Sequence, residues 1–145
     1  MPAIVKELTI TASPGCVFNA LTLQDELARW WTNDLNVTPE VGSFAEFRFG
    51  EWGAALRFEV AELDEGSKVR WIHRLSPVAQ WTGTSVTWQL TPVHNGTTVV
   101  FNHDGFAQVD EVYEQTREKW EDILDSLKSF LETGKGTPGI PPFVL

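Results

Sequence analysis

The sequence KVRWIHRL at residues 68–75 decides which class of fold this chain can adopt. Apolar or aromatic side chains alternate along it with mostly basic ones, so that one set is Val69, Trp71, His73 and Leu75 and the other is Lys68, Arg70, Ile72 and Arg74. A period of two is typical of a strand with one buried face. Similar alternation recurs between residues 43 and 103, interrupted by turn signals at 64–67 and 94–96. The middle of the chain therefore predicts an antiparallel strand meander.

One further strand and three helices are expected to flank this meander. Residues 4–10 alternate like a strand, and Ser13-Pro14 is typical of a helix start. A second short helix follows Asp25, while residues 112–131 carry an apolar stripe with helical period and end near Gly134. We expect an α+β fold in which a curved antiparallel sheet of about six strands wraps around a long C-terminal helix, with two short helices after the first strand.

The length of 145 residues is sufficient for one hydrophobic core. We expect a single domain over residues 1–136, followed by a proline-rich C-terminal tail over residues 137–145. The tail ends in Phe143-Val144-Leu145, which could stay loose or dock on a hydrophobic groove. Self-association through exposed strands or through this tail is open, so the chain is expected to be a monomer or a homodimer.

Composition and charge exclude several classes of partner and location. The net charge of −9 opposes binding to nucleic acid and to anionic membranes. No signal peptide and no run of apolar residues long enough to span a membrane are recognised, so membrane insertion is not expected. Cys16 is the only cysteine, which excludes an internal disulfide and favours a cytoplasmic location.

Tryptophan is unusually abundant, with seven residues in the chain. Strand and helix periodicity places Trp71, Trp88 and Trp120 on faces that point to the interior. Indoles bury a large apolar area and need a partner for the N–H group, so a cluster of them can either fill a core or line a cavity. If a cavity exists, its lining is expected to comprise Trp31, Trp71, His73, Trp88, Phe101, His103, Trp120 and Leu124.

Several motifs in a fixed order resemble the START-like, or SRPBCC, superfamily, and most closely its branch of homologues of the activator of the heat-shock-protein ATPase. They are ITASPGCVFNALT at 10–22, ARWW at 28–31, TWQLTP at 87–92, GTTV at 96–99, HDGF at 103–106, and Trp120 in a long helix that ends at Gly134. The resemblance covers nearly the whole chain. It implies a helix-grip fold with a cavity between sheet and long helix, and it does not imply one reaction, since such folds host transporters, cyclases, hydrolases and co-chaperone domains.

His73 and His103 are the candidate catalytic residues, because both fall on the inward face of strands separated by one other strand. A neutral imidazole there could orient a ligand or act as a general base. The alternative is a pair of core histidines that bond to a backbone carbonyl or an indole. The histidines and Cys16 lack the spacing of metal ligands, so neither a metal nor a cofactor is expected.

Other polar and aromatic residues have competing interpretations. Glu46 and Arg48 could clamp a polar ligand or form an exposed cross-strand ion pair. Asp104 before Gly105 is typical of a turn. Cys16 has no recognisable catalytic partner. Trp30 and Trp31 are adjacent on a helix and should point about 100° apart, so either one lies at a pocket mouth while the other packs, or the pair has a structural capping role.

The sequence therefore favours binding of a small, mostly hydrophobic ligand, possessing an aromatic or lipid-like character, between the sheet and the C-terminal helix. It favours binding over catalysis because no catalytic constellation is recognised. One alternative is an enzyme like a polyketide cyclase or hydrolase, with His103 or His73 as general base. Another, suggested by the family branch, is a co-chaperone-like regulator of an ATPase.

Overall fold

The computed structural model describes residues 2–49, 54–75 and 78–142. The helices are α1 (Pro14–Thr22), α2 (Gln24–Trp30) and α3 (Glu111–Thr133), with a short 3-10 turn η2 (Ala79–Trp81). The strands are β1 (Ala3–Ile10), β2 (Asp34–Val37), β3 (Phe44–Phe49), β4 (Ala54–Asp64), β5 (Lys68–Leu75), β6 (Ser85–Val93) and β7 (Gly96–Asp104). The turn expected around Gly50 and Gly53, and the terminal residues 143–145, lie outside the described residues.

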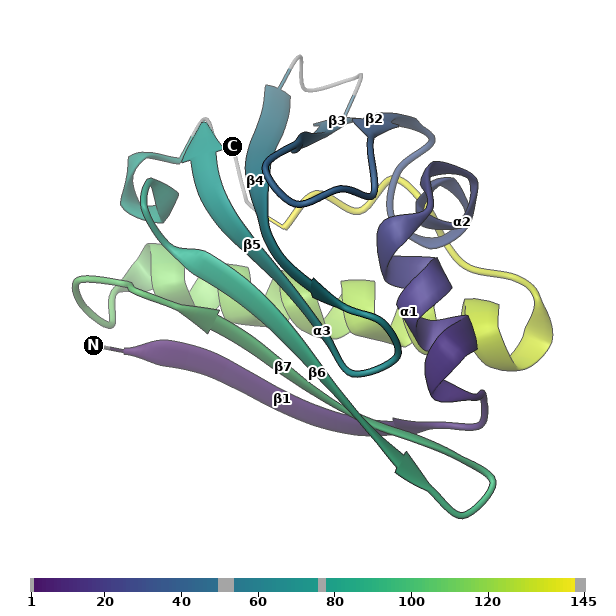
Figure 1. Ribbon diagram of the computed structural model, residues 1–145. Coiled ribbons are helices and arrows are strands. Elements are labelled where there is room, and N and C mark those ends of the chain that lie inside the picture. The colour runs from purple at the N-terminus through teal and green to yellow at the C-terminus, as the bar shows by residue number, and fades with distance from the viewer. Residues whose placement is uncertain (1, 50–53, 76–77, 143–145) are drawn as a thin grey trace.

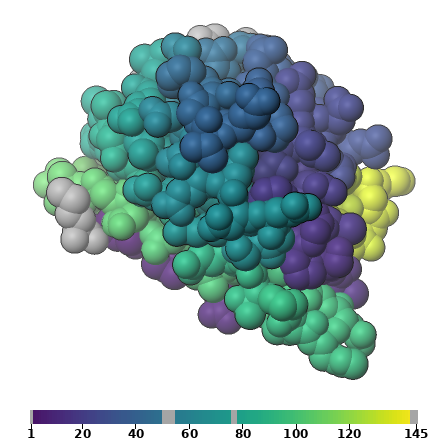
Figure 2. Space-filling model, viewed as in Figure 1, coloured from purple at the N-terminus to yellow at the C-terminus, as the bar shows by residue number. Residues whose placement is uncertain are grey.

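The strands form one antiparallel sheet in the order β1-β7-β6-β5-β4-β3-β2. Helix α3 crosses one face of this sheet, α1 and α2 cover one end, and the hairpin between β6 and β7 projects from the body of the molecule (Figures 1 and 2). This is the expected helix-grip fold. The sequence indicated about six strands, and the additional strand is β2, which pairs with β3 where only a turn was expected.

The helix ends follow the local sequence. Ser13 caps α1 by accepting a hydrogen bond from the backbone N–H of Cys16 at 3.2 Å, and proline occupies the next position. The expected end of α3 is confirmed, because Gly134 adopts φ +84° and its N–H donates to the carbonyl of Phe130 at 2.8 Å. The start of α3 is capped by Asp110, whose carboxylate accepts from the N–H of Tyr113 at 2.9 Å.

The inward face of β5 confirms the alternation of the sequence, except at its end. Val69, Trp71 and His73 are buried, whereas Leu75 is 58% exposed. A register shift lies between β4 and β5 at Arg57 and Phe58, so that Leu75 pairs with Arg57 on the outer face. The prediction of an inward Leu75 was wrong because a bulge reverses the direction of the side chains that follow it.

The first residues of the C-terminal tail pack on the domain. The N–H of Gly139 donates to the carbonyl of Trp31 at 2.6 Å, and the N–H of Thr137 donates to the hydroxyl of Ser126 at 2.7 Å. A Cβ at position 136 would lie 2.5 Å from the carbonyl oxygen of Arg29 and 2.8 Å from Cα of Trp30, so only glycine fits there. The tail therefore runs across the junction of α2 and α3 (Figure 1).

Candidate functional site

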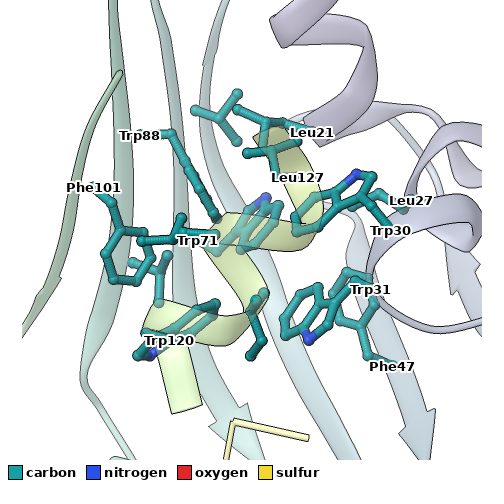
Figure 3. Close-up of a cluster of buried hydrophobic side chains, with 14 of the residues drawn as sticks. Leu21, Leu27, Trp30, Trp31, Phe47, Trp71, Trp88, Phe101, Trp120 and Leu127 are labelled. Carbon is teal, nitrogen blue, oxygen red and sulfur yellow. The ribbon is translucent and has the colours of Figure 1, made fainter. Parts of the chain in front are cut away.

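Aromatic rings fill the space between the sheet and α3 (Figure 3). Trp120 on α3 lies with its ring centroid 4.6 Å from Phe101 and 5.6 Å from Trp31. Trp71 lies 5.8 Å from Trp88 and stacks on Trp31 at 6.1 Å. Each of these side chains is 2% exposed or less. The structure thus brings together the aromatic residues expected from the sequence, and it brings them into mutual contact.

Both indoles of the Trp30-Trp31 pair are fully buried, which favours the structural interpretation of the pair over an indole at a pocket mouth. Trp31, the C-cap of α2, stays in the αR region, and its ring is buried because it lies 4.2 Å from that of Phe47 on β3. The two indole rings stack on each other with centroids 6.0 Å apart. Trp30 Nε1 donates to the carbonyl of Ala20 at 2.8 Å, which leaves Trp31 to face the sheet.

His103 has a hydrogen-bond partner at each ring nitrogen. Trp120 Nε1 donates to His103 Nδ1 at 3.1 Å, so Nδ1 is an acceptor and the proton of the neutral ring is on Nε2. Nε2 then donates to Thr84 Oγ1 at 2.9 Å, and that hydroxyl donates to the carbonyl of Trp81 at 2.6 Å. The interpretation of His103 as a core histidine held by a neighbouring indole agrees with this geometry.

Trp81, Thr84 and Thr116 extend this network and were not among the site residues predicted from the sequence. Trp81 Nε1 donates to Thr116 Oγ1 at 3.3 Å, and Thr116 donates to the carbonyl of Val112 at 2.8 Å. Trp81 lies in the turn η2, where no strand or helix period indicates which way it points. Its position after the hydrophobic strand β5 is the only signal in the sequence, and that signal is weak.

His73 presents the opposite case. It is fully buried beside Phe58 and Trp81, with ring centroids at 4.8 Å and 5.4 Å, and neither of its ring nitrogens has a hydrogen-bond partner among the described residues. The indole nitrogens of Trp31 and Trp88 are likewise buried without such a partner. Three of the residues expected to bind a ligand thus carry unsatisfied polar atoms in the core.

Burial changes the acid–base behaviour of both histidines. Desolvation lowers the pKa of His73 to about 4. The same cause, with a smaller contribution from His73, lowers the pKa of His103 to about 3. Both imidazoles are therefore neutral at pH 7, as a charged ring surrounded by indoles would lose its hydration without gaining a counter-ion.

Several hollows lie around this cluster. One of about 10 Å³ reaches Trp71 from the surface between the end of α1, the segment after β2, and the β4–β5 hairpin. A groove of about 230 Å³ lies between β1 and α3, and Leu124 forms part of its lining. An open groove of about 600 Å³ separates α3 from the tail. The expected cavity between the sheet and α3 remains a prediction.

The remaining polar candidates lie away from the aromatic cluster. Arg48 contacts Glu46 of its own strand at 3.3 Å and Asp34 of the neighbouring strand β2 at 2.9 Å on the outer face of the sheet, which agrees with the ion-pair interpretation, although the cross-strand partner is Asp34. Asp104 ends β7 at the turn formed by Gly105, which has φ +103°. Cys16 is exposed. Within the described residues, no group of three or more His, Cys, Asp or Glu side chains could hold a metal ion.

Comparison with known families supports the interpretation of the fold. The model of the Activator of Hsp90 ATPase homolog 1-like protein family matches residues 11–132, which is most of the chain. The chain belongs to this family. A comparison with curated protein sequences gave no match. No described helix is long and apolar enough to cross a membrane.

Solved structures agree with the family. The solution structure of the Aha1 dimer from Colwellia psychrerythraea is 37% identical, covers 94% of this chain and 100% of its own, and has a TM-score of 0.85. SSP2350 from Staphylococcus saprophyticus is 20% identical over 94% of this chain and 96% of its own, with a TM-score of 0.79. DynU16, from the dynemicin biosynthetic locus, is 22% identical over 92% of this chain and 48% of its own, with a TM-score of 0.78. The last two show the fold alone.

Proposed function

We propose that this protein binds a small, mostly hydrophobic, ring-containing ligand between its sheet and α3. The observation that carries the proposal is the group of unsatisfied polar atoms on Trp31, His73 and Trp88 within an otherwise apolar cluster. A buried polar group without a partner costs about 1–3 kcal/mol, so natural cores rarely keep several of them together. A ligand that supplies the missing partners would recover this free energy on binding.

The unsatisfied atoms indicate the chemistry of the ligand. The indole nitrogens of Trp31 and Trp88 only donate, so they select a group with acceptor oxygens, such as a ketone or an ether. His73 is neutral and can donate from one nitrogen and accept at the other. The surrounding rings of Trp71, Phe101 and Trp120 favour a flat apolar body. A neutral, oxygen-bearing aromatic or lipid-like molecule fits these requirements best.

Entry of such a ligand requires side chains to move. The rings are in contact, and the hollow of about 10 Å³ beside Trp71 has only about the volume of one water-sized probe. Trp71 is 2% exposed, and it is the aromatic residue of the set that borders this hollow. We therefore infer that the ligand enters past Trp71, between the end of α1 and the β4–β5 hairpin.

Intrinsic tryptophan fluorescence titrated with a panel of flavonoids, polyketides and fatty acids tests the proposal. A saturable change with at least one compound is expected. His73→Phe should weaken binding of that compound roughly tenfold, because it removes a hydrogen bond in a desolvated site. The matched control is His94→Phe, since His94 is exposed in the β6–β7 turn and should leave the affinity unchanged. A panel without any saturable change contradicts the proposal.

Catalysis of the cyclase or hydrolase type is the second candidate, and the free ring nitrogens of His73 favour it. Both nitrogens of His103 are engaged, so His73 is the histidine with a site open for proton transfer. Turnover of a bound polyketide that disappears in His73→Phe and persists in His103→Gln would support this candidate. A regulator of a chaperone ATPase, which the family description suggests, would instead stimulate the hydrolysis of ATP by a purified chaperone.

We also propose that the chain forms a homodimer. The relative from Colwellia psychrerythraea is described as a dimer and is 37% identical over 94% of this chain. Sedimentation equilibrium over a range of concentrations tests this directly. A single species with the mass of one chain at all concentrations would overturn it.

A further inference from the structure

The two edges of the sheet differ in length and in protection. The edge strand β2 has four residues, and Asp34 and Asn36 on it contact Arg48 of β3. The other edge strand, β1, has eight residues and pairs within the sheet with β7 alone. The carbonyl of Ala3 accepts from the hydroxyl of Tyr113 at 2.7 Å, and the backbone N–H and C=O groups along the rest of the outer side of β1 form a template for another strand.

The outer face of the sheet divides into a half with many ion pairs and a half with few charged side chains. On β3, β4 and β5 the outward side chains form ion pairs, among them Lys68 with Glu62 at 2.9 Å and Arg74 with Glu59 at 3.1 Å. On β6 and β7 they are mostly hydroxyl or amide groups, namely Ser85, Thr87, Gln89, Thr91, Thr98 and Asn102, with Val100 among them, and Asp104 at the end of β7 is the one charged exception. Val5 on β1 continues this half and is 57% exposed.

We propose that β1 of one copy pairs with β1 of a second copy, antiparallel, across a two-fold axis normal to the sheet. This inference rests on the homodimer proposed above and assigns its surface. A second copy carries the same net charge of −9, so the two chains can approach closely only where negative charge is sparse. On the outer face of the sheet the half beside β1 carries few carboxylates, Glu7 and Asp104, and on the helix side Lys6 lies among the acidic groups, so this edge comes nearest to that condition. The sheets of both copies would become continuous.

The side chains of β1 select one register. In an antiparallel pair, opposite residues point to the same face, so the axis must pass through a residue of β1. An axis through Glu7 would place two Glu7 carboxylates opposite each other, which is unfavourable. An axis through Val5 would pair only residues 3–7. An axis through Lys6 pairs residues 3–9 of each copy and places Val5 opposite Glu7 and Ile4 opposite Leu8. It also brings the two Lys6 residues opposite each other, and Glu121 of α3 offsets this repulsion because Lys6 already pairs with it.

The helix side of β1 is compatible with this axis. Lys6 points inward and forms an ion pair with Glu121 of α3. The groove between β1 and α3 also contains Glu7 and Asp125, so its lining is acidic apart from Lys6 itself. The Lys6 of the second copy would enter this groove and meet Glu121, so that each lysine is flanked by two carboxylates.

Matched substitutions at two exposed valines test the proposal. Val5→Glu places a carboxylate opposite Glu7 in both symmetry-related pairs, and the dimer dissociation constant should rise roughly tenfold. Val5→Lys places an ammonium there and should leave the constant unchanged or lower it. Val41→Glu is the control, because Val41 is 62% exposed in the segment between β2 and β3 and far along the sheet from β1.

Sedimentation equilibrium of the full chain gives the dissociation constant of each variant, and circular dichroism checks that each is folded. A dimer weakened by Val5→Glu alone supports pairing through β1. A wild-type dimer that Val5→Glu does not weaken overturns the assigned surface but leaves self-association standing. A dimer weakened equally by Val5→Glu and Val5→Lys overturns the register, and a monomeric wild type overturns both proposals.

Discussion

His73 and His103 occupy equivalent positions on the inward face of the sheet, one on β5 and one on β7, and both are fully buried. Around His103 each polar atom has a partner, from Trp120 through the imidazole to Thr84 and the carbonyl of Trp81. Around His73 the ring nitrogens have none within the described residues. The hydrogen-bonded surroundings of His103, the satisfied side of the core, therefore stabilise the fold. The surroundings of His73, the unsatisfied side, carry a free-energy cost that a bound ligand would remove under the proposed function.

The largest expected effect is the pH dependence of stability. In the unfolded chain each histidine takes up a proton near pH 6.5, while the folded pKa is about 4 for His73 and about 3 for His103. The unfolded state therefore binds more protons below pH 6.5, and stability falls as the pH is lowered. Each histidine should remove up to about 1.4 kcal/mol per pH unit until its folded pKa is reached.

Chemical denaturation between pH 7.5 and 4.5 measures this slope. His73→Phe and His103→Phe should each remove about half of it, if both folded pKa values are as low as burial indicates. The exposed carboxylates of Glu62 and Glu121 contribute at lower pH, because ion pairs with lysine lower their pKa below 4.5. A slope that both variants leave intact would show that the two histidines are hydrated in the folded state.

The same pair of variants compares the two sides directly at pH 7.5. His103→Phe leaves the indole of Trp120 and the hydroxyl of Thr84 without a partner, and it should cost about 2–4 kcal/mol of stability. His73→Phe removes polar atoms that bond to nothing in the described structure, so it should be neutral or stabilising. If both cost the same, the distinction between a satisfied and an unsatisfied side is wrong.

Ser126 is a second buried polar residue whose hydrogen bonds are satisfied, and its removal tests how much such bonds contribute to stability. Its buried hydroxyl donates to the carbonyl of Trp30 at 2.6 Å and accepts from the N–H of Thr137 at 2.7 Å. Ser126→Ala should cost about 1–3 kcal/mol, because two backbone groups lose their partner. Ser129→Ala is the control, since its hydroxyl bonds to the carbonyl of Lys135 at the exposed surface and should matter by less than about 1 kcal/mol. Equal losses in urea denaturation would contradict the bridging role.

Much of the fold could be predicted because it depends on periodicity. The alternation on β5 and β7 predicted that both histidines point inward, and the helical stripe followed by Gly134 predicted the end of α3. Prediction failed where the outcome depends on more than the regular pattern: the bulge opposite Arg57 turned Leu75 outward, and packing against Phe47 of β3 buries Trp31. Sequence periods carry no information about either event.

The sequence predicted which residues make up the candidate site, but it did not predict which of their polar atoms have hydrogen-bond partners. Periodicity gathers Trp71, Trp88 and Trp120 in one layer, but it cannot say which indole finds an acceptor. That outcome depends on contacts between segments far apart in the chain, such as Trp120 with His103. Trp81 was missed for a related reason, since a short 3-10 turn sets its direction.

The smallest expected effect separates two indoles of equal burial. Trp120→Phe and Trp88→Phe remove similar apolar area from side chains that are both fully buried, and both leave a ring among rings. Trp120 additionally donates to His103, whereas Trp88 Nε1 has no partner among the described residues. Trp120→Phe should therefore cost about 1 kcal/mol more than Trp88→Phe in urea denaturation.

Adding His103→Phe to each variant completes a double-mutant cycle, in which only the pair with Trp120 should show coupling. Coupling of equal size with Trp88 would mean that packing, and not the hydrogen bond, distinguishes the two sides of the core.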